Sequence, residues 1–347
     1  MTQRKIRVLI ADDSPATLDM LTLLLSKDPA IEVVGRALDG KQAVKLAREL
    51  RPDVITMDVV MPELDGLDAT SAIMQEAPTR VIIVSGMDDQ QLDLSFRAIG
   101  VGALEVLRKP SPSEANNIAA WGRRVAEAVR VLSEVPVVRR TTRVPTANDD
   151  QAAGGTFDVV GIVASTGGPT ALATILGALP ADLPIPVLVT QHLASSFTAG
   201  FVRWLRSGSQ LPVQIADHRS IARPGRVYLP PDDHHLEVSR EGELMVRIGT
   251  ERIVPSGDLM LTSLANAYRA RACGVVLTGM GADGAEGLGQ IRRFGGVTLA
   301  QDEKSCTVFG MPRAARDRGA TDQLLSPEQI AAFIRTRCRP AGPLRRM

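Results

Sequence analysis

The chain has 347 residues, of which 44% are hydrophobic and 23% are charged. This balance is typical of a folded globular protein and excludes a disordered or fibrous chain. At roughly 150 residues per domain, the length predicts about two domains, each large enough to bury a core. Forty Lys and Arg side chains against 39 Asp and Glu give a formal net charge of +1, which on charge alone excludes a polybasic nucleic-acid binder.

The residue pattern indicates neither membrane insertion nor a disulfide framework. No apolar run approaches the roughly 18 residues that span a bilayer, and the amino-terminal residues lack the apolar core of a signal peptide. Three widely spaced cysteines argue against paired disulfides and against a zinc site; they are Cys273, Cys306 and Cys338. We therefore expect a cytoplasmic protein in a reducing compartment.

Residues 1–134 alternate short apolar runs with amphipathic stretches. The strand-length runs lie at residues 8–10, 54–57 and 81–84. Between the first two runs, apolar side chains recur with helical spacing, for example at Leu18, Leu21 and Leu25. Strands that alternate with helices predict a parallel sheet with helices on both faces.

A linker and a second α/β domain are predicted to follow. Residues 135–156 mix proline, threonine, charge and glycine without a period, which is typical of a linker. Residues 157–336 resume the alternation of strands and helices, so a doubly wound α/β domain is expected there. Residues 337–347 are predicted to form a basic tail.

Five reactive or charged side chains lie just past the carboxyl ends of predicted strands in the first domain. They are Asp12, Asp13, Asp58, Ser85 and Lys109. Open parallel sheets place their ligand crevice at this edge. Because three converging carboxylates repel one another, a hard divalent cation such as Mg²⁺ would relieve the repulsion. A single strand-end aspartate is more simply a helix cap, but the whole set suits an acyl-phosphate on one aspartate.

Together with the stretch DVVMPELDG, this set resembles the receiver domain of two-component response regulators over residues 4–132. The resemblance implies a flavodoxin-like sheet, with Asp58 as phosphoacceptor and a histidine kinase as phosphodonor. It also implies a cis bond between Lys109 and Pro110, where proline makes the cis form inexpensive. The remaining implied roles are Mg²⁺ binding by Asp12, Asp13, Asp58 and the Val60 carbonyl, and phosphoryl binding by Ser85 and Lys109.

In the second domain, the stretch GIVASTGGPTAL runs from a strand through a turn into a helix, with Ser165 at the turn. Such a place suits a nucleophilic serine or anion and nucleotide binding by helix amides. It also suits a capped turn without chemistry. The stretch matches neither G-x-G-x-x-G nor G-x-S-x-G, so the turn alone leaves these readings open.

Two further strand ends favour the nucleophile. The strand PVLVTQH ends in His192, and GVVLTGMGADGAEGL places Asp283 after another strand. In one crevice, His192 would take the Ser165 proton as general base, and Asp283 would orient the imidazole. A dinucleotide fold would instead prefer an acidic residue where Gln191 and His192 stand.

The other histidines have loop-like surroundings. His218 stands alone, and His234-His235 follow Asp232-Asp233. This second group is a weak candidate for a metal site, because no distant ligand supports it.

Residues 157–336 resemble the catalytic domain of chemotaxis protein-glutamate methylesterases, the CheB family. The motifs ASTGGPTAL, QHL, PGRVYLPPDDHHL, LTGMGADGAEGL and VFGMPRAA carry the resemblance in that order. It implies a phosphorylation-activated esterase that hydrolyses glutamyl methyl esters on methyl-accepting chemoreceptors and often deamidates receptor glutamines. No cofactor is implied in this domain. The alternative is a non-catalytic, phosphorylation-dependent receptor-binding regulator.

Carried onto this sequence, the resemblance makes Ser165 the nucleophile, His192 the base and Asp283 the orienting carboxylate. The Thr166 and Met280 positions are implied neighbours of the oxyanion. Two stretches depart from the family pattern: LASSFTAGF after His192, and Gly257 within PSGD. We expect both to affect the substrate groove or the contact with the receiver without touching the three catalytic side chains.

Overall fold

The computed structural model describes residues 4–86, 89–111, 114, 117–136 and 156–338. The chain divides into two compact units, Met1–Thr141 and Thr142–Met347. Most of the predicted linker, residues 137–155, lies outside the described residues. So do residues 339–347 of the predicted basic tail.

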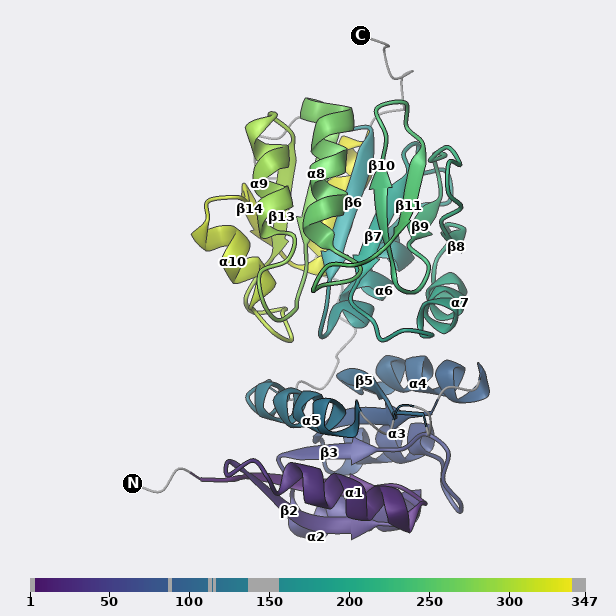
Figure 1. The fold of residues 1–347 in the computed structure, drawn as a ribbon, viewed down its shortest axis with the longest axis vertical. Helices are drawn as coiled ribbons and strands as arrows, with labels where there is room; N and C mark the ends of the chain where they lie inside the picture. Colours follow the sequence, from purple (N-terminus) through teal and green to yellow (C-terminus); the bar gives the residue numbers. More distant parts are fainter. Residues whose placement is uncertain (1–3, 87–88, 112–113, 115–116, 137–155, 339–347) are drawn as a thin grey trace. The chain divides into compact units, whose positions relative to one another are not determined.

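The first unit is a five-stranded parallel sheet with the order β2-β1-β3-β4-β5. Its elements are β1 (Ile6–Ala11), α1 (Pro15–Leu25), β2 (Ile31–Ala37), α2 (Gly40–Leu50), β3 (Val54–Met57), α3 (Gly66–Glu76), β4 (Arg80–Ser85), α4 (Asp89–Val101), β5 (Glu105–Arg108) and α5 (Ile118–Ser133) (Figure 1). This is the flavodoxin-like order, in which the chain reverses direction across the sheet between β1 and β3. The ends of β1 and β3 therefore flank the crevice where such folds bind ligands.

The burial of the central strands explains their sequence pattern. Residues of the central strands β3 and β4 are buried on both sheet faces, since helices cover both. This explains why the runs read as continuously apolar rather than alternating. Helix α1 begins at Pro15, and the side chain of Ser14 caps it by accepting from the N–H of Thr17.

The second unit is built on a seven-stranded parallel sheet with the order β14-β13-β12-β6-β7-β9-β8. Its strands are β6 (Val159–Ala164), β7 (Val187–Gln191), β8 (Val213–Ile215), β9 (Val227–Leu229), β12 (Ala272–Val276), β13 (Val297–Gln301) and β14 (Gln323–Leu325). Strand β6 comes first in the chain and has later strands on both sides. The topological switch point therefore lies at the carboxyl end of β6.

Helices and one antiparallel hairpin complete the second unit. The helices are α6 (Gly168–Ala178), α7 (Thr198–Gly208), α8 (Gly257–Tyr268), the short η2 (Arg269–Arg271), α9 (Ala285–Arg293), α10 (Met311–Asp317) and α11 (Pro327–Arg337). The hairpin pairs β10 (His234–Val238) with β11 (Leu244–Ile248). Figure 1 shows α8 across the face of the sheet with this hairpin beside it, and Leu236 and Val238 share a core cluster with Met260 and Leu264.

The two α/β units confirm the predicted fold class, a receiver-like parallel sheet followed by a doubly wound α/β domain. Helix α5 ends at Ser133, close to the predicted end of the first domain at residue 134. Helix α11 ends at Arg337, one residue inside the predicted tail.

Candidate functional site

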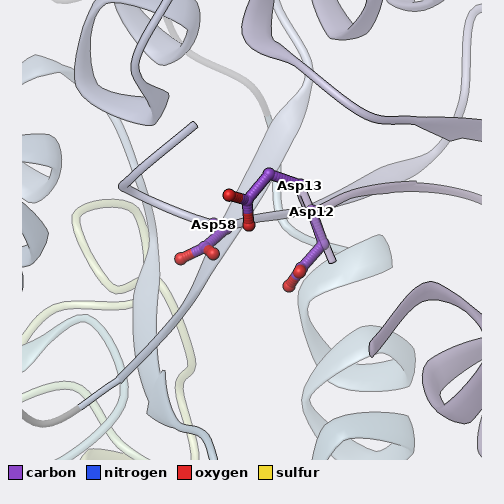
Figure 2. Close-up of side chains that lie close together, drawn as sticks. All are labelled: Asp12, Asp13 and Asp58. Atoms are coloured by element: carbon purple, nitrogen blue, oxygen red, sulfur yellow. The ribbon is translucent and has the colours of Figure 1, made fainter. Parts of the chain in front are cut away.

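In the first unit, three aspartates meet at the switch point of the sheet. The register pairs Ala11 with Met57, so Asp12 and Asp58 each follow directly on neighbouring strands. One oxygen from each of Asp12, Asp13 and Asp58 lies within 4.8 Å of the others (Figure 2). Asp12 and Asp58 are buried, whereas Asp13 is exposed. The structure therefore brings together the acidic cluster that the sequence predicted, with one side open to solvent.

Lys109 neutralises part of this cluster. Its Nζ lies 2.6 Å from Oδ2 of Asp58 and 2.7 Å from Oδ2 of Asp12. Burial raises the pKa of Asp58, and the attraction of Lys109 only partly offsets that rise. Burial alone would lower the pKa of Lys109, but the two carboxylates outweigh it and hold that pKa above its ordinary value. Lys109 is thus a fixed positive charge beside the predicted phosphoacceptor.

Ser85 ends β4 on the neighbouring side of the same edge. It is fully buried, and its Oγ has no hydrogen-bond partner among the described residues. Its carbonyl oxygen accepts from the N–H of Lys109 at 2.7 Å, which ties the two residues together. A buried hydroxyl without a partner costs free energy unless a ligand uses it.

The peptide bond between Lys109 and Pro110 differs from the form that the sequence predicted. Within the described residues the only cis peptide bond precedes Pro255, so the bond between Lys109 and Pro110 is trans. The cis prediction was therefore wrong, and the trans form is the one that an X-Pro bond intrinsically favours. Val60 lies two residues after Asp58 and is 42% exposed.

In the second unit, Ser165 stands at the switch point, directly after β6. Its N–H donates to the carbonyl of Thr278 at 3.0 Å, and its carbonyl accepts from the N–H of Gly168 at 2.7 Å. Gly167 has φ +77°, a left-handed conformation that favours glycine. These bonds fix the strand-to-helix turn that presents the serine.

Gln191 connects the ends of β6 and β7. Its Nε2 donates to the carbonyl oxygens of Ser165 at 2.9 Å and of His192 at 3.0 Å. Because the register pairs Ala164 with Gln191, Ser165 and His192 are the next residues on two adjacent parallel strands. Adjacent strands lie about 4.8 Å apart, so the two side chains leave the same edge of the sheet as neighbours.

His192 is bonded to Asp283 across 91 residues of chain, with Nε2 2.8 Å from Oδ2. Since a carboxylate only accepts, Nε2 carries the proton and Nδ1 is left as the acceptor nitrogen of the neutral ring. No hydrogen bond joins Ser165 Oγ to His192 in the described part of the chain. The structure therefore brings all three predicted residues to one strand edge, with the His–Asp contact formed.

Asp283 is held by the amino-terminal turn of α8. Oδ1 accepts from Ser256 Oγ at 3.1 Å and from the N–H of Asp258 at 3.0 Å, and Oδ2 accepts from the N–H of Gly257 at 2.6 Å. Burial alone would raise the pKa of Asp283. The hydrogen bond from His192, the attraction of that ring when it is protonated, and the two backbone donors outweigh burial and hold the pKa below its ordinary value. Asp283 is thus a carboxylate at neutral pH.

Gly257 corrects the expectation that the PSGD departure lies apart from the catalytic side chains. Its N–H is a direct donor to Asp283. A Cβ at this position would lie 2.2 Å from Cγ1 of Val163, so a side chain there would force the strand residue to move. The glycine lets the helix approach β6 closely enough to bind the carboxylate.

Thr166 directly follows Ser165, and Met280 follows Gly279, where an added Cβ would lie 2.5 Å from Cβ of Ser165. The N–H groups of Thr166 and Met280 donate to no acceptor within the described ranges. The Thr166 carbonyl accepts from Thr278 Oγ1 at 2.9 Å, which orients the turn. Both N–H groups are therefore available to an outside acceptor.

Comparison with known proteins bears directly on this arrangement. Residues 160–334 match the family model described as CheB methylesterase, and residues 8–119 match that of the response regulator receiver domain. A protein-glutamate methylesterase/protein-glutamine glutaminase of Myxococcus xanthus is 52% identical over 97% of this chain and 95% of its own length. The chain belongs to the CheB methylesterase family.

A second relative agrees with this membership. A protein of the same description from Anaeromyxobacter dehalogenans is 45% identical over 94% of this chain and 97% of its own length. The crystal structure of the Thermotoga maritima CheB methylesterase catalytic domain is 33% identical, covering 53% of this chain and 99% of that one, with a TM-score of 0.49. The resemblance inferred from the sequence is confirmed: this is a CheB methylesterase that carries a receiver domain.

The remaining histidines of this CheB family member take other places. Among the described residues, the only metal-compatible acidic or histidine cluster is that of Asp12, Asp13 and Asp58, so the His234-His235 pair gains no support as a metal site. His234 Nδ1 contacts the carbonyl of Asp232 at 2.6 Å. His218 Nδ1 accepts from the N–H of Val246 at 3.2 Å.

Sequence reasoning missed three residues that support the catalytic side chains. Gln191 was noted only by position, Ser256 only within a divergent stretch, and His235 only as a weak metal candidate. Only Ser256 had a local signal in the sequence, because serine is a typical helix N-cap and Ser256 caps α8. The other contacts join residues distant in the chain.

No helix among the described residues is both long and apolar enough to cross a membrane.

Proposed function

We propose that this chain hydrolyses glutamyl methyl esters on methyl-accepting chemoreceptors, and glutamine side-chain amides there, with Ser165 as nucleophile, His192 as base and Asp283 as orienting carboxylate. The observation that carries the proposal is the bond from His192 Nε2 to an Asp283 carboxylate held by three further donors. That bond leaves Nδ1 unprotonated at the edge where Ser165 stands. Family membership supports the same reaction class.

The chemistry follows from the fixed tautomer. His192 Nδ1 accepts the hydroxyl proton as Ser165 Oγ bonds to the ester carbonyl carbon. The carbon–oxygen bond to the methoxy group then breaks, and the imidazolium returns the proton to methanol. Water, deprotonated by the same nitrogen, attacks the acyl-enzyme and releases the glutamate carboxylate and Ser165. With a glutamine substrate, ammonia leaves in place of methanol.

The carboxylate and the free amides have distinct roles in this scheme. Asp283 stabilises the imidazolium that forms in each half-reaction and keeps the ring in one orientation. The N–H groups of Thr166 and Met280 are the proposed donors to the developing oxyanion. Each such donor is worth about 10²–10³ in rate in serine hydrolases.

We infer that Asp58 of the receiver accepts a phosphoryl group from a chemotaxis histidine kinase. The unpartnered Ser85 hydroxyl and the Lys109 ammonium support phosphoryl binding at that edge. Asp12, Asp13 and Asp58 fit Mg²⁺, because oxygen atoms of the three lie within 4.8 Å and one side is exposed. These carboxylates, with the Val60 carbonyl, would hold the ion, which when bound neutralises phosphoryl charge.

Phosphorylation at Asp58 is proposed to raise esterase turnover. A coupling of about 1–3 kcal/mol, or roughly 5- to 150-fold, is the usual scale of such control. A cytoplasmic location is part of the same proposal, since a kinase phosphodonor acts there.

The test is methanol release from methylated receptor. Ser165→Ala should abolish it, whereas Ser207→Ala, which alters an exposed serine of α7, should retain it. A fluorophosphonate probe should label the wild type and fail to label Ser165→Ala. Methanol release by Ser165→Ala would refute the nucleophile. Binding to receptors without labelling or turnover in the wild type would favour a non-catalytic regulator.

Gating is tested separately with a phosphodonor. Asp58→Asn should keep basal methanol release and lose its stimulation, whereas Asp19→Asn on the exposed surface of α1 should keep both. Equal stimulation of the wild type and Asp58→Asn would refute control through Asp58.

A further inference from the structure

His235 is a fully buried histidine whose two ring nitrogens both have partners. In β10, its Nδ1 accepts from the N–H of Ser256 at 3.0 Å, and its Nε2 lies 2.7 Å from Oε2 of Glu251. A backbone N–H can only donate, so Nδ1 carries no proton. The ring is therefore neutral, with its one proton on Nε2 and donated to Glu251.

The residue that His235 binds is the one that begins α8. Ser256 is the N-cap of the helix, and its Oγ both accepts from the N–H of Leu259 and donates to Asp283. The next two N–H groups, of Gly257 and Asp258, also donate to Asp283. Three of the four donors on the Asp283 carboxylate thus come from consecutive residues, and His235 binds the first of these residues.

We propose that His235 is a positioning residue of the esterase: by accepting from the Ser256 N–H it fixes the first turn of α8, which holds Asp283 against His192. The inference rests on the proposed function, because it assigns His235 a role through the proposed catalytic pair. It gives the antiparallel hairpin β10–β11 a task in catalysis. Asp283 is held on a helix end, and the hairpin holds that helix end.

Glu251 binds the other ring nitrogen of His235, Nε2. It is an exposed residue that also pairs with Arg247, whose Nη2 lies 2.9 Å away, and Arg247 in turn pairs with Glu237. The hydrogen bond from Arg247, followed by those of the Thr250 N–H and His235, lowers the pKa of Glu251 to about 2. Glu251 is therefore an acceptor for the His235 proton throughout the pH range of the assay.

A pair of substitutions separates the two contacts of His235. In His235→Asn the amide oxygen takes the place of Nδ1 and keeps an acceptor for the Ser256 N–H. In His235→Gln the longer side chain reaches toward Glu251 and offers no acceptor at the Nδ1 position. His235→Phe removes both acceptor and donor at similar volume. We expect kcat about 10- to 100-fold lower in His235→Phe and His235→Gln, because a misplacement of about 1 Å can cost on the order of 10²-fold in rate.

The measurements are kcat and KM for methanol release by the full-length protein with methylated receptor. The proposal predicts lower kcat with KM unchanged for His235→Phe and His235→Gln, and kcat within about threefold of wild type for His235→Asn. Glu251→Ala, a surface change that leaves the core intact, should lower kcat less than His235→Phe, since water can accept the Nε2 proton.

A spectroscopic signature distinguishes positioning from a general loss of stability. The hydrogen-bonded His192 Nε2 proton should give a downfield imidazole resonance, assigned by its loss in His192→Ala. That resonance should shift in His235→Gln and persist in His235→Asn, at temperatures where both variants are folded by circular dichroism. His218→Phe is the matched control, since His218 also accepts a backbone N–H through Nδ1 but is exposed and contacts Val246 of β11 instead of Ser256; kcat should not change.

Equal kcat losses in His235→Asn and His235→Gln would overturn the proposal, because the Nδ1 acceptor would then make no difference. Unchanged kcat in His235→Phe, or an effect confined to KM, would overturn it as well. If His235→Phe does not fold, the comparison of His235→Asn with His235→Gln decides. Failure of the inference differs from failure of the proposed function, which would instead appear as methanol release by Ser165→Ala.

Discussion

The Nε2 atom of Gln191 donates to the carbonyl oxygen of Ser165 at 2.9 Å, across 26 residues of chain. The same nitrogen donates to the carbonyl oxygen of His192, so a single carboxamide binds the backbone of both proposed reacting residues. The amide oxygen of Gln191 is buried and has no partner among the described residues. Leaving a buried acceptor unpaired costs about 1–3 kcal/mol. The two hydrogen bonds from Nε2 nevertheless hold the ends of β6 and β7 together.

Gly168 and Gln191 should therefore be coupled energetically. A Cβ at Gly168 would lie 2.1 Å from Oε1 of Gln191 and 2.7 Å from Cβ of Ala164. We expect Gly168→Ala to cost about 1–3 kcal/mol by overpacking and to lower kcat by displacing the carboxamide. In Gly168→Ala/Gln191→Ala the first clash is gone, so the double variant should lose less stability than the sum of the single variants. Urea denaturation of the three proteins measures this, and additive losses would contradict the coupling.

Asp283→Asn should remove most of the activity while the protein remains folded. Asparagine replaces one oxygen by an NH₂ group, which then faces donors from His192, Ser256 or the α8 amides instead of accepting from them. In serine hydrolases the equivalent change lowers kcat about 10⁴-fold by favouring the wrong tautomer. Methanol release measures the loss. Asp302→Asn, at a partly exposed site after β13, is the control. A loss below tenfold would indicate that Asp283 does not orient the base.

Local patterns in the sequence were sufficient to predict the fold of both units and the strand edges at which the site residues lie. Apolar runs of strand length, helical spacing and residues at strand ends predict both α/β units, the acidic cluster and the approach of Ser165, His192 and Asp283. These predictions succeed because every parallel strand ends at the same edge of its sheet, so that residues after strands meet there whatever their separation along the chain.

The supports of the site could not be predicted in the same way. His235 reaches Ser256 only because the β10–β11 hairpin packs on α8, and Gln191 reaches Ser165 only because β6 and β7 are neighbours in that register. Gly257 looked like a departure from a family pattern, yet its lack of a side chain admits the helix to Asp283. Such contacts depend on packing between distant segments, which no local pattern encodes.

The depressed pKa of Asp283 makes stability depend on pH in a definite direction. Below its ordinary value of 3.8 the unfolded chain binds the proton before the folded protein does. The carboxylate therefore stabilises the fold fully above that pH, and this contribution is lost as the pH falls through the lower, folded-state pKa. The difference in unfolding free energy between wild type and Asp283→Asn should shrink as the pH is lowered from 6 to about 3.

Fluorescence isolates the second unit for this measurement. The chain has two tryptophans, and a Trp121→Phe background leaves Trp204 of α7 as the reporter. Guanidinium denaturation at each pH gives the two free energies. A difference that stays constant or widens toward acid would contradict a depressed pKa at Asp283.

Ser85→Ala should separate phosphoryl binding from folding in the first unit. The Ser85 hydroxyl is fully buried and unpartnered among the described residues, so removing it should leave the unfolding free energy unchanged or raise it by up to about 1 kcal/mol. Phosphorylation of Asp58 by a small acyl-phosphate donor should nevertheless slow, because the phosphoryl group loses a donor.

Ser95→Ala is the matched control: that serine is also buried, but its hydroxyl donates to the Gln91 carbonyl at 2.7 Å. It should cost about 0.5–1.5 kcal/mol and leave phosphorylation unaffected. Trp121 fluorescence in a Trp204→Phe background follows unfolding, and equal destabilisation by the two alanines would mean that the Ser85 hydroxyl has a structural partner after all.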